Sequence, residues 1–386
     1  MVRRRRHVAA PVLAELKSWL AEKAYPIWWQ NGADHRLGGF HEQLRQDGAP
    51  VLAAKRARVQ PRQIYSFSKA HSLGWAGDGP AAVRHGIDFF LAHYRRADGL
   101  FRTLVTPEGG IADDSIAFYD QAFALLGLHA AYVTLGEPPF YRDLARQLLA
   151  QWRATRAHAE IGFAEQPSGL LPLGANPHMH LLESALAWSE VDEDGPWLAL
   201  AEELVQLALT RLIGKGSGAL REFFDRDWRP MPGYADRQIE PGHQFEWAWL
   251  LLRWSRLSAA PAAQAAALRL IALGESHGVD SRRGVAINGL RDDLGVADGN
   301  ARLWPQTERL KAHCLAAELT GERGRWASAI AAARGLMRYL DTPLAGLWYD
   351  QLTPEDRFID QPAPASSFYH IVCAIAELDR AVAATS

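Results

Sequence analysis

The sequence has little cysteine and no long apolar run among its 386 residues. Its two cysteines, Cys314 and Cys373, each lie within an apolar pattern of helical period and have no partner at metal-ligand spacing. We therefore expect buried free thiols and no disulfide. No apolar stretch reaches the length needed to span a bilayer. Glu15 and Lys17 interrupt the N-terminal segment "MVRRRRHVAAPVLAELKSWL", so it is not typical of a signal peptide, and we expect a cytoplasmic protein.

The sequence also has no large excess of charge of either sign, because its 42 Lys+Arg residues nearly balance its 44 Asp+Glu residues. Without a broad electrostatic field, we expect no nucleic-acid partner and no anionic membrane partner. The sequence contains no phosphate-binding glycine loop, no dinucleotide fingerprint and no nucleophile elbow. These absences favour a cofactor-free enzyme and narrow the chemistry to isomerisation, epimerisation or hydrolysis. We expect a monomer or a homodimer.

Apolar residues of helical period mark about twelve segments, which come in pairs. The first members are amphipathic, whereas the second members are apolar on all sides, as in "FEWAWLLLRW", which indicates burial on every side. The first members are expected near residues 11–29, 79–96, 140–156, 195–213, 261–277 and 324–340. The second members begin near residues 62, 115, 176, 242, 304 and 366. Within each pair, a strand-like piece that contains glycine lies between the first and the second member. These pieces are near residues 39, 99, 162, 219, 284 and 347.

A period of about 60 residues is the signature of a repeat architecture. Six helix pairs predict an all-α (α/α)6 barrel with short β-hairpins on one rim. We expect one catalytic domain over residues 1–386, with residues 1–10 forming a flexible basic N-terminus. In such a barrel the second members form the inner ring, and their N-termini converge on one cavity.

Polar and ionisable residues occupy the starts of the expected inner helices. Asn176, His180 and Glu183, at i, i+4 and i+7, share one helical face, and His243 shares a face with Glu246. His178 points away from His180, so we expect a structural role for it and no metal ion shared by the two histidines.

Further candidates stand at equivalent positions of other repeats. Arg62 opens the first inner helix, Tyr119 lies early in the second, Trp304 opens the fifth, and His370 lies early in the last. Histidines that titrate near neutrality are suited to moving a proton on and off a carbon next to a carbonyl, while an arginine stabilises the enediolate oxygen. An aromatic face such as that of Trp304 suits the apolar face of a sugar.

Two other classes of function are open to the same barrel. A glycoside hydrolase works with two carboxylates, and its candidates are Asp113, Asp114, Glu183, Glu246 and Glu308. The hydrolase hypothesis leaves the histidines of the expected cavity without a role. A sugar- or protein-binding module would not need an acid/base pair, and nothing in the sequence marks a partner surface. Proton transfer on a sugar is therefore the favoured reading.

Five motifs resemble the N-acylglucosamine 2-epimerase family, which includes cellobiose 2-epimerases and aldose–ketose isomerases that act on mannose. They are, in chain order, "RQIYSFSKA", "NPHMHLLE", "GHQFEWAWLL", "LWPQTE" and "SSFYHIV". The resemblance covers almost the whole chain, and it implies an (α/α)6 barrel without a metal or cofactor.

The same resemblance implies roles for individual residues. His243 and His370 would be the acid/base pair, and Arg62 would hold the oxygens of the sugar. The residues implied to bind substrate or to support the histidines are Asn176, His180, Tyr119, Glu183, Glu246 and Trp304.

The choice of substrate within the family depends on finer likeness. "SSFYHIV" and the short connections are more similar to the mannose isomerases, which predicts interconversion of D-mannose and D-fructose through an enediolate. "VQPRQ" is similar to a pattern of the N-acylglucosamine epimerases, so 2-epimerisation of a mannose/glucose, N-acylglucosamine or cellobiose type stays open. Arg58 and Arg302 leave a phosphorylated sugar open as well.

Overall fold

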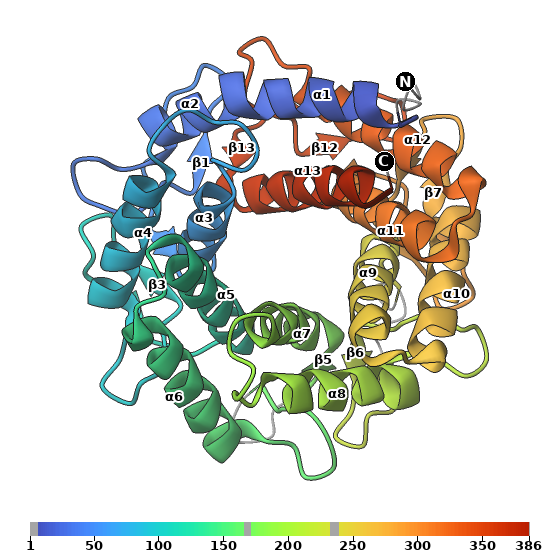
Figure 1. Ribbon diagram of the computed structural model, residues 1–386, viewed down its shortest axis with the longest axis horizontal. Helices are drawn as coiled ribbons and strands as arrows, with labels where there is room; N and C mark the ends of the chain where they lie inside the picture. The colour runs from blue at the N-terminus through green and yellow to red at the C-terminus, as the bar shows by residue number, and fades with distance from the viewer. Residues whose placement is uncertain (1–6, 166–170, 232–238, 386) are drawn as a thin grey trace, which may run out of the picture.

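The computed structural model describes residues 7–165, 171–231 and 239–385, which form a ring of helices around a central axis (Figure 1). The outer helices of these residues are α1 (Ala10–Trp19) with its continuation η1 (Leu20–Ala24), α2 (Tyr25–Ile27) and η2 (Trp28–Gly32), α4 (Gly79–Tyr94), α6 (Pro139–Arg156), α8 (Trp197–Leu207) with η3 (Ala208–Leu212), α10 (Pro261–Gly278) and α12 (Arg323–Leu340). The inner helices are α3 (Val59–Ser68), α5 (Phe118–Thr134), α7 (Ala175–Ser189), α9 (Pro241–Ser258), α11 (Trp304–Thr320) and α13 (Ala365–Thr385). The expected (α/α)6 barrel is confirmed.

The inner helices close a complete ring, because each packs against the next and α13 packs against both α11 and α3. The position of a helix in the inner or the outer ring explains how its apolar residues are distributed. Along α5, buried side chains face every direction, whereas α6 buries one stripe that includes Leu144, Leu148 and Trp152. A helix that is apolar all round has protein on every side, and an amphipathic helix has solvent on one.

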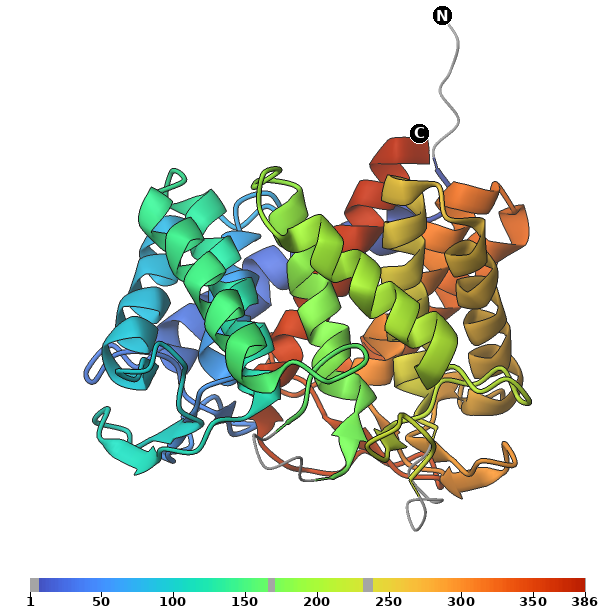
Figure 2. The same ribbon diagram turned by 90° about the horizontal axis from the view of Figure 1, so that it is seen from below.

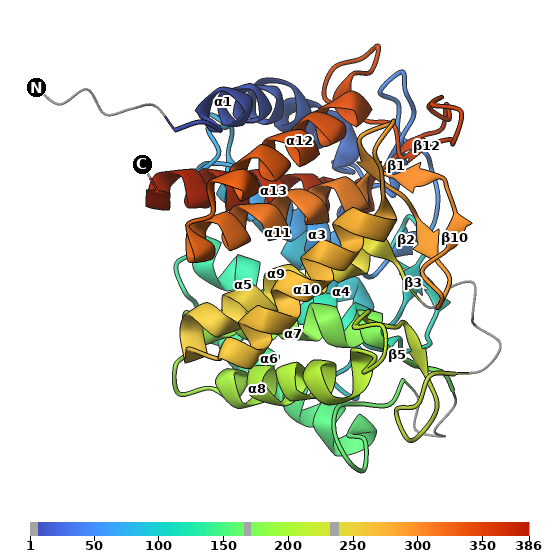
Figure 3. The same cartoon turned by 90° about the vertical axis from the view of Figure 1, so that its right-hand side faces the viewer.

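Short strands gather at one end of the barrel, whereas α1 begins and α13 ends at the other end (Figures 2 and 3). They are β1 (Gln43–Leu44), β2 (Lys55–Arg56), β3 (Leu104–Val105), β4 (Ile111–Asp113), β5 (Leu173–Gly174), β6 (Phe223–Phe224), β7 (Val279–Asp280), β8 (Val285–Ala286), β9 (Gly289–Leu290), β10 (Val296–Asp298), β11 (Ala301–Arg302), β12 (Gln351–Leu352) and β13 (Ala363–Pro364). The strand end is therefore the end at which the inner helices begin.

Short antiparallel strand pairs stand on this rim, as expected, but only some of them are hairpins within one connection. Antiparallel pairs form within one connection for β3–β4, β7–β8 and β9–β10. The pairs β1–β13, β2–β3, β5–β6 and β11–β12 instead join neighbouring connections. Strands of two residues are too short to stand alone as a hairpin, so a neighbouring connection completes the ladder and links the repeats at this rim.

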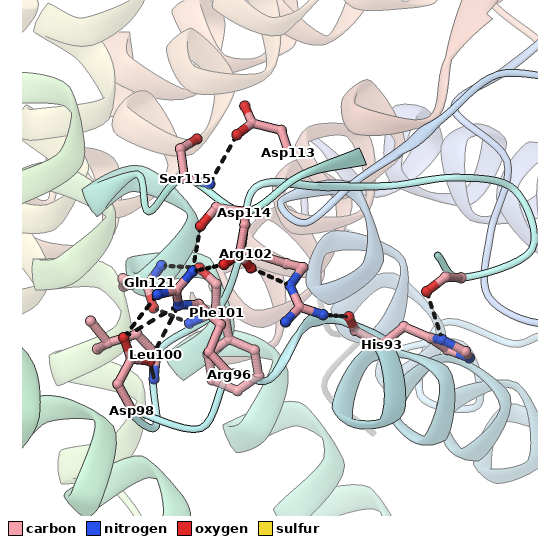
Figure 4. A network of polar contacts seen from close by, with 11 residues as sticks. His93, Arg96, Asp98, Leu100, Phe101, Arg102, Asp113, Asp114, Ser115 and Gln121 are labelled. Atoms are coloured by element: carbon pink, nitrogen blue, oxygen red, sulfur yellow. Dashed lines mark hydrogen bonds and ion pairs between the residues drawn. The ribbon is translucent and has the colours of Figure 1, made fainter. Parts of the chain in front are cut away.

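A glutamine at the start of an inner helix holds the turn that precedes it. In the second repeat, the Gln121 side chain accepts the Phe101 N–H at 2.9 Å and donates to the Phe101 carbonyl at 2.8 Å (Figure 4). Arg96 and Arg102 converge on Asp114 beside it and fix the β3–β4 hairpin. The same two-bond clamp joins Gln60 to Phe40, Gln244 to Leu220 and Gln306 to Ala286.

His178 takes the place of this glutamine in the third repeat. Its Nε2 accepts the Phe163 N–H at 3.0 Å, and its Nδ1–H donates to the Gly174 carbonyl at 2.7 Å. Burial lowers the pKa of His178 to about 4, so the ring is neutral and can make both bonds. The expected structural role is thus the turn clamp of this repeat.

Each of the five clamped turns also contains a glycine with positive φ, where a side chain would be strained. These glycines are Gly39, Gly99, Gly162, Gly218 and Gly284. Gly346 has a positive φ at the corresponding place of the sixth repeat, and all six belong to the strand-like pieces seen in the sequence.

Three further expectations concern the N-terminus, the cysteines and membrane-spanning helices. The flexible N-terminus was expected over residues 1–10, of which residues 1–6 lie outside the described residues, and α1 begins at Ala10. Cys314 and Cys373 are buried and free. Among the described helices, none combines the length and the apolarity needed to cross a membrane.

Candidate active site

A cavity of about 210 Å³ opens at the strand end, between the first turns of the inner helices. Its lining residues are Arg62, Tyr119, Asn176, His180, Glu240, His243, Glu246, Arg302, Trp304, Ser366, Ser367 and His370. All the site residues expected from the sequence line it except Glu183. The cavity is smaller than the pockets of about 300–1,000 Å³ that hold drug-sized ligands, and it suits a monosaccharide.

His243 lies in the first turn of α9 and carries a positive charge. Its Nδ1 lies 2.9 Å from Glu222 Oε2 and 3.7 Å from Glu240 Oε2. Burial by itself lowers the pKa of His243, but the Glu222 and Glu240 carboxylates outweigh burial and raise the pKa to about 10. His243 is therefore an imidazolium near neutral pH, and its Nε2, which makes no hydrogen bond with the described residues, is a proton donor into the cavity.

His370 on α13 has the opposite character. Its Nδ1–H donates to Glu308 Oε1 at 2.8 Å, which leaves Nε2 without a hydrogen bond to any described residue. Burial, with Arg62 and Lys311 nearby, holds the pKa of His370 well below its ordinary value. The ring is neutral near pH 7, and its free Nε2 is a proton acceptor.

The Trp304 ring contacts both histidines. Its centroid is 5.0 Å from that of His243 and 5.8 Å from that of His370. The close approach of Gly242 explains how the indole fits, since a Cβ on Gly242 would come within 2.3 Å of Trp304. The indole thus lines the cavity next to both the donor and the acceptor.

His180 and Glu183 form a neutral–ionised pair on α7. His180 Nδ1–H donates to Glu183 Oε2 at 3.3 Å, and the Tyr369 hydroxyl donates to the same oxygen. Burial lowers the pKa of His180 to about 3. Burial raises the pKa of Glu183, but the bonds from His180 and Tyr369 and the charge of Lys311 bring it down to about 2. Glu183 lies behind the cavity and orients His180.

Glu246 is a buried carboxyl group without a hydrogen-bond partner among the described residues. Burial, together with the Glu308 and Glu183 carboxylates, raises its pKa well above the ordinary value. It is therefore a neutral acid that can donate a hydrogen bond to a ligand. Its nearest histidine contact is His180 Nδ1, at 4.0 Å from Oε1.

Arg62 on α3 is a buried cation whose planar group faces aromatic rings. Its guanidinium lies 4.2 Å from the Phe123 ring centroid and donates to the Tyr119 hydroxyl. Its Nε has no hydrogen-bond partner, and neither does Oδ1 of Asn176, within the part of the chain that the structure describes. These free groups point to bonds with the oxygens of a bound ligand.

The carboxylates that hold His243 and His370 are not the two that the sequence suggested. Glu183 accepts from His180, as expected of a supporting group, whereas Glu246 makes no hydrogen bond with the described residues. His243 is held by Glu222 and His370 by Glu308. Glu222 lies just before β6, in a connection whose pairing the helical period does not predict. A residue 21 positions before its histidine carries no spacing signal, so the sequence alone did not reveal it.

The carboxylates offered for hydrolysis do not form one pair. Asp113 and Asp114 lie on the exposed β3–β4 hairpin, where Asp114 pairs with Arg96 and Arg102. Glu183, Glu246 and Glu308 belong to the histidine network. Arg58, considered as a phosphate ligand, pairs with Asp120 at 2.8 Å and does not line the cavity.

Three groups of side chains are close enough to be considered as metal ligands. They are His180–Glu183–Glu246, Glu222–Glu240–His243 and Glu246–Glu308–His370, with ligand atoms within 4.8 Å of one another. In each group a histidine Nδ1 already donates to a carboxylate, or Lys311 pairs with one. Hydrogen bonds and ion pairs account for these clusters, so we assign none of these side chains as a metal ligand.

A larger cavity of about 340 Å³ opens at the opposite end of the barrel. It lies among the C-terminal turns of the inner helices, beside residues such as Lys69 and Arg253, and shares only Glu183 with the expected site. Because it contains neither the donor His243 nor the acceptor His370, the candidate chemistry belongs to the smaller cavity.

Comparison with known proteins places the chain in a family. The family model of N-acylglucosamine 2-epimerase (GlcNAc 2-epimerase) matches residues 38–374. A protein of Rhizobium meliloti (strain 1021) named mannose-6-phosphate isomerase is 45% identical over 371 residues, which cover 95% of this chain and 96% of that protein. A D-mannose isomerase of Thermobifida fusca is 27% identical over 88% of this chain and 87% of that protein.

The solved structure of cellobiose 2-epimerase from Bacillus thermoamylovorans B4167 has the same fold. It superimposes with a TM-score of 0.86 at 18% identity, over 96% of this chain and 100% of that one. Together with the family match and the 45% relative, the barrel and its histidine cavity lead to one conclusion. The chain belongs to the N-acylglucosamine 2-epimerase family and is an enzyme of the isomerase class.

Proposed function

We propose that the protein interconverts D-mannose and D-fructose by proton transfer through an enediolate, without a cofactor. The observation that carries this proposal is the pair of histidines next to Trp304 in one cavity, whose pKa values are moved in opposite directions. A neutral imidazole accepts a proton and an imidazolium donates one. A cavity that offers both at once is suited to moving protons between neighbouring atoms of a sugar.

The steps balance with two protein groups. His243 first gives its proton to the ring oxygen and takes up the proton that leaves O1, which opens the sugar to the aldehyde and leaves His243 protonated again. Nε2 of His370 then takes the proton from C2 of mannose, while His243 protonates O1, and an enediol forms. His370 returns its proton to C1 and His243 takes the proton from O2, which leaves fructose and restores both histidines.

The remaining side chains of the cavity bind the substrate. Arg62, with Tyr119 bound to it, stabilises the negative charge that develops on the enediolate oxygens. Asn176 and the neutral His180 offer hydrogen bonds to hydroxyl groups, and Trp304 receives an apolar face of the sugar. Exclusion of water from this small cavity strengthens each of these interactions.

A phosphorylated substrate is the second candidate, because a relative at 45% identity is named mannose-6-phosphate isomerase. A phosphate dianion is bound by clustered cations. Here Arg302 is the cation nearest the cavity mouth, and its Nε lies 3.6 Å from Asp350 Oδ2. The outer extension of the cavity also contains the acidic residues Glu240 and Asp298. This charge arrangement favours the neutral sugar.

A 2-epimerase is the alternative outcome of the same chemistry. If His243 returned a proton to C2 from the opposite face, the product would be the epimeric aldose. A free donor and a free acceptor in one cavity are compatible with both outcomes, and the neutral state of His370 favours a single base that acts at both carbons.

Product analysis tests the proposal. Purified enzyme is incubated with mannose, mannose 6-phosphate, glucose, N-acetylmannosamine and cellobiose, and the products are separated by chromatography. We expect fructose from mannose, with a kcat/KM for mannose above that for mannose 6-phosphate. Preference for the phosphorylated sugar, lost in Arg302→Gln, would establish the second candidate and refute the first.

A further inference from the structure

Lys311 is a fully buried lysine on α11, inside the ring of inner helices. Its Nζ lies 2.6 Å from Glu308 Oε2 and 3.9 Å from the centroid of the Trp249 ring. A buried ammonium costs several kcal/mol in lost solvation unless it is well paired. It does not line the cavity, so it does not bind the substrate directly.

Glu308 bridges Lys311 and His370. One carboxylate oxygen faces the lysine, and the other accepts the His370 Nδ1–H at 2.8 Å. The Thr307 hydroxyl also donates to this second oxygen, at 3.2 Å. An ionised carboxylate can only accept hydrogen bonds, whereas a protonated one can also donate. The charge state of Glu308 therefore decides where the proton of His370 resides.

The surroundings of Glu308 would protonate it if the lysine were absent. Acidic groups face it from two other inner helices, Glu246 on α9 and Glu183 on α7. Burial, the largest effect, raises the pKa of Glu308 above its ordinary value, and Glu183 adds to this. Lys311 is the main group that lowers this pKa, so without the lysine it would be higher still. The other charged or titratable groups of this interior are His180 on α7, Cys373 beside His370 on α13, and Arg62 on α3.

We infer that Lys311 is a positioning residue, which keeps Glu308 ionised and thereby fixes the His370 proton on Nδ1, so that Nε2 is the basic nitrogen in the cavity. A protonated Glu308 would donate to Nδ1 instead and move the histidine proton to Nε2. That nitrogen could then no longer accept a proton from carbon. The catalytic consequence rests on the proposed function, but the tautomer itself does not.

Nitrogen-15 NMR of histidine-labelled enzyme tests this inference without any substrate. Two-bond ¹⁵N–¹H correlations distinguish the Nδ1–H from the Nε2–H tautomer, and the signals of His370 are identified by their loss in His370→Gln. We expect the Nδ1–H tautomer in the wild type at pH 7–8. An Nε2–H tautomer or an imidazolium there would overturn the inference, whatever the enzyme converts.

Two variants then separate the lysine from the rest of the network. In Lys311→Met we expect His370 to change to the Nε2–H tautomer. In Lys311→Met/Glu308→Gln we expect Nδ1–H to return, because a glutamine oxygen accepts without an ammonium nearby. A neutral pair in place of a buried ion pair is often tolerated well, so the double variant is informative even if the single variant folds poorly. The exposed Lys23→Met is the control.

Activity gives a second readout. If the proposed function holds, kcat of Lys311→Met falls about 10²-fold or more, as for a lost general base, while KM changes little. The double variant should be more active than Lys311→Met. An unchanged Nδ1–H tautomer in folded Lys311→Met would refute the positioning role, even if kcat fell.

Discussion

Glu222→Gln tests the assignment of His243 as the proton donor. In the wild type, Glu222 Oε2 lies 2.9 Å from His243 Nδ1. The substitution keeps the size of the side chain and an oxygen that can accept the His243 Nδ1–H, but it removes the negative charge. Loss of an opposite charge at this distance lowers a pKa by about 1–3 units. The pKa of His243, raised to about 10 by Glu222 and Glu240 against the effect of burial, should therefore fall to about 7–9.

The sign of the pH effect follows from the role of each histidine. A donor must be protonated, so activity is present below the pKa of His243 and is lost as the pH rises through about 10. An acceptor must be neutral, so activity is lost as the pH falls through the lowered pKa of His370. Glu222→Gln should move only the alkaline limb of kcat/KM, to lower pH.

The size of the effect depends on pH. We expect kcat/KM of Glu222→Gln to be close to that of the wild type near pH 6 and about 2–100-fold lower at pH 9, the range that a pKa of about 9 down to about 7 gives. Initial rates of fructose formation from mannose, corrected for the reaction without enzyme, give both profiles. Glu240→Gln should shift the limb less, because its carboxylate is 3.7 Å away and partly exposed. The exposed Glu160→Gln is the matched control. An alkaline limb that stays in place in folded Glu222→Gln would refute the assignment.

Three further predictions concern catalysis, stability and metal dependence. His243→Ala and His370→Ala should each lower turnover by about 10²–10⁴-fold while circular dichroism shows an intact helical fold; near wild-type turnover in either would remove that histidine from the mechanism. His178→Ala should leave the Phe163 N–H unsatisfied and lower the free energy of unfolding in urea by about 1–3 kcal/mol. His178→Gln should recover most of this loss, since glutamine makes the clamp in other repeats, and equal stability of the two variants would contradict the clamp. Activity should survive dialysis against a strong chelator; loss that one added divalent ion reverses would require a metal site, for which the His180–Glu183–Glu246 group is a candidate.

The helices of the barrel could be predicted from the sequence because one physical rule, burial, determines their pattern. The expected segment 261–277 is α10 (Pro261–Gly278), and the expected segment 79–96 is α4 (Gly79–Tyr94). The rim was less predictable. A strand of two residues has almost no periodicity, and whether it pairs within its own connection or with the next depends on the closure of the ring.

The site was predictable where helical spacing carried the information. Arg62, His180, His243 and His370 stand in the first turns of their helices, and the barrel brings these turns together. Glu183, the partner of His180, was predictable from the same spacing. The partners of His243 and His370 were not, because Glu222 comes from a connection and Glu308 from a different inner helix than His370. The protonation states also depend on burial and on these partners, so they emerge only from the assembled fold.

Proton transfer in heavy water tests the central claim most directly. Mannose is incubated with enzyme in D₂O, and the products are followed by NMR at early times. If His370 alone moves the proton between C2 and C1, fructose is the dominant product, with deuterium at C1 and partial retention of the original hydrogen. Glucose labelled at C2 as the main product, with little fructose, would contradict the account and show that two opposed histidines act on C2.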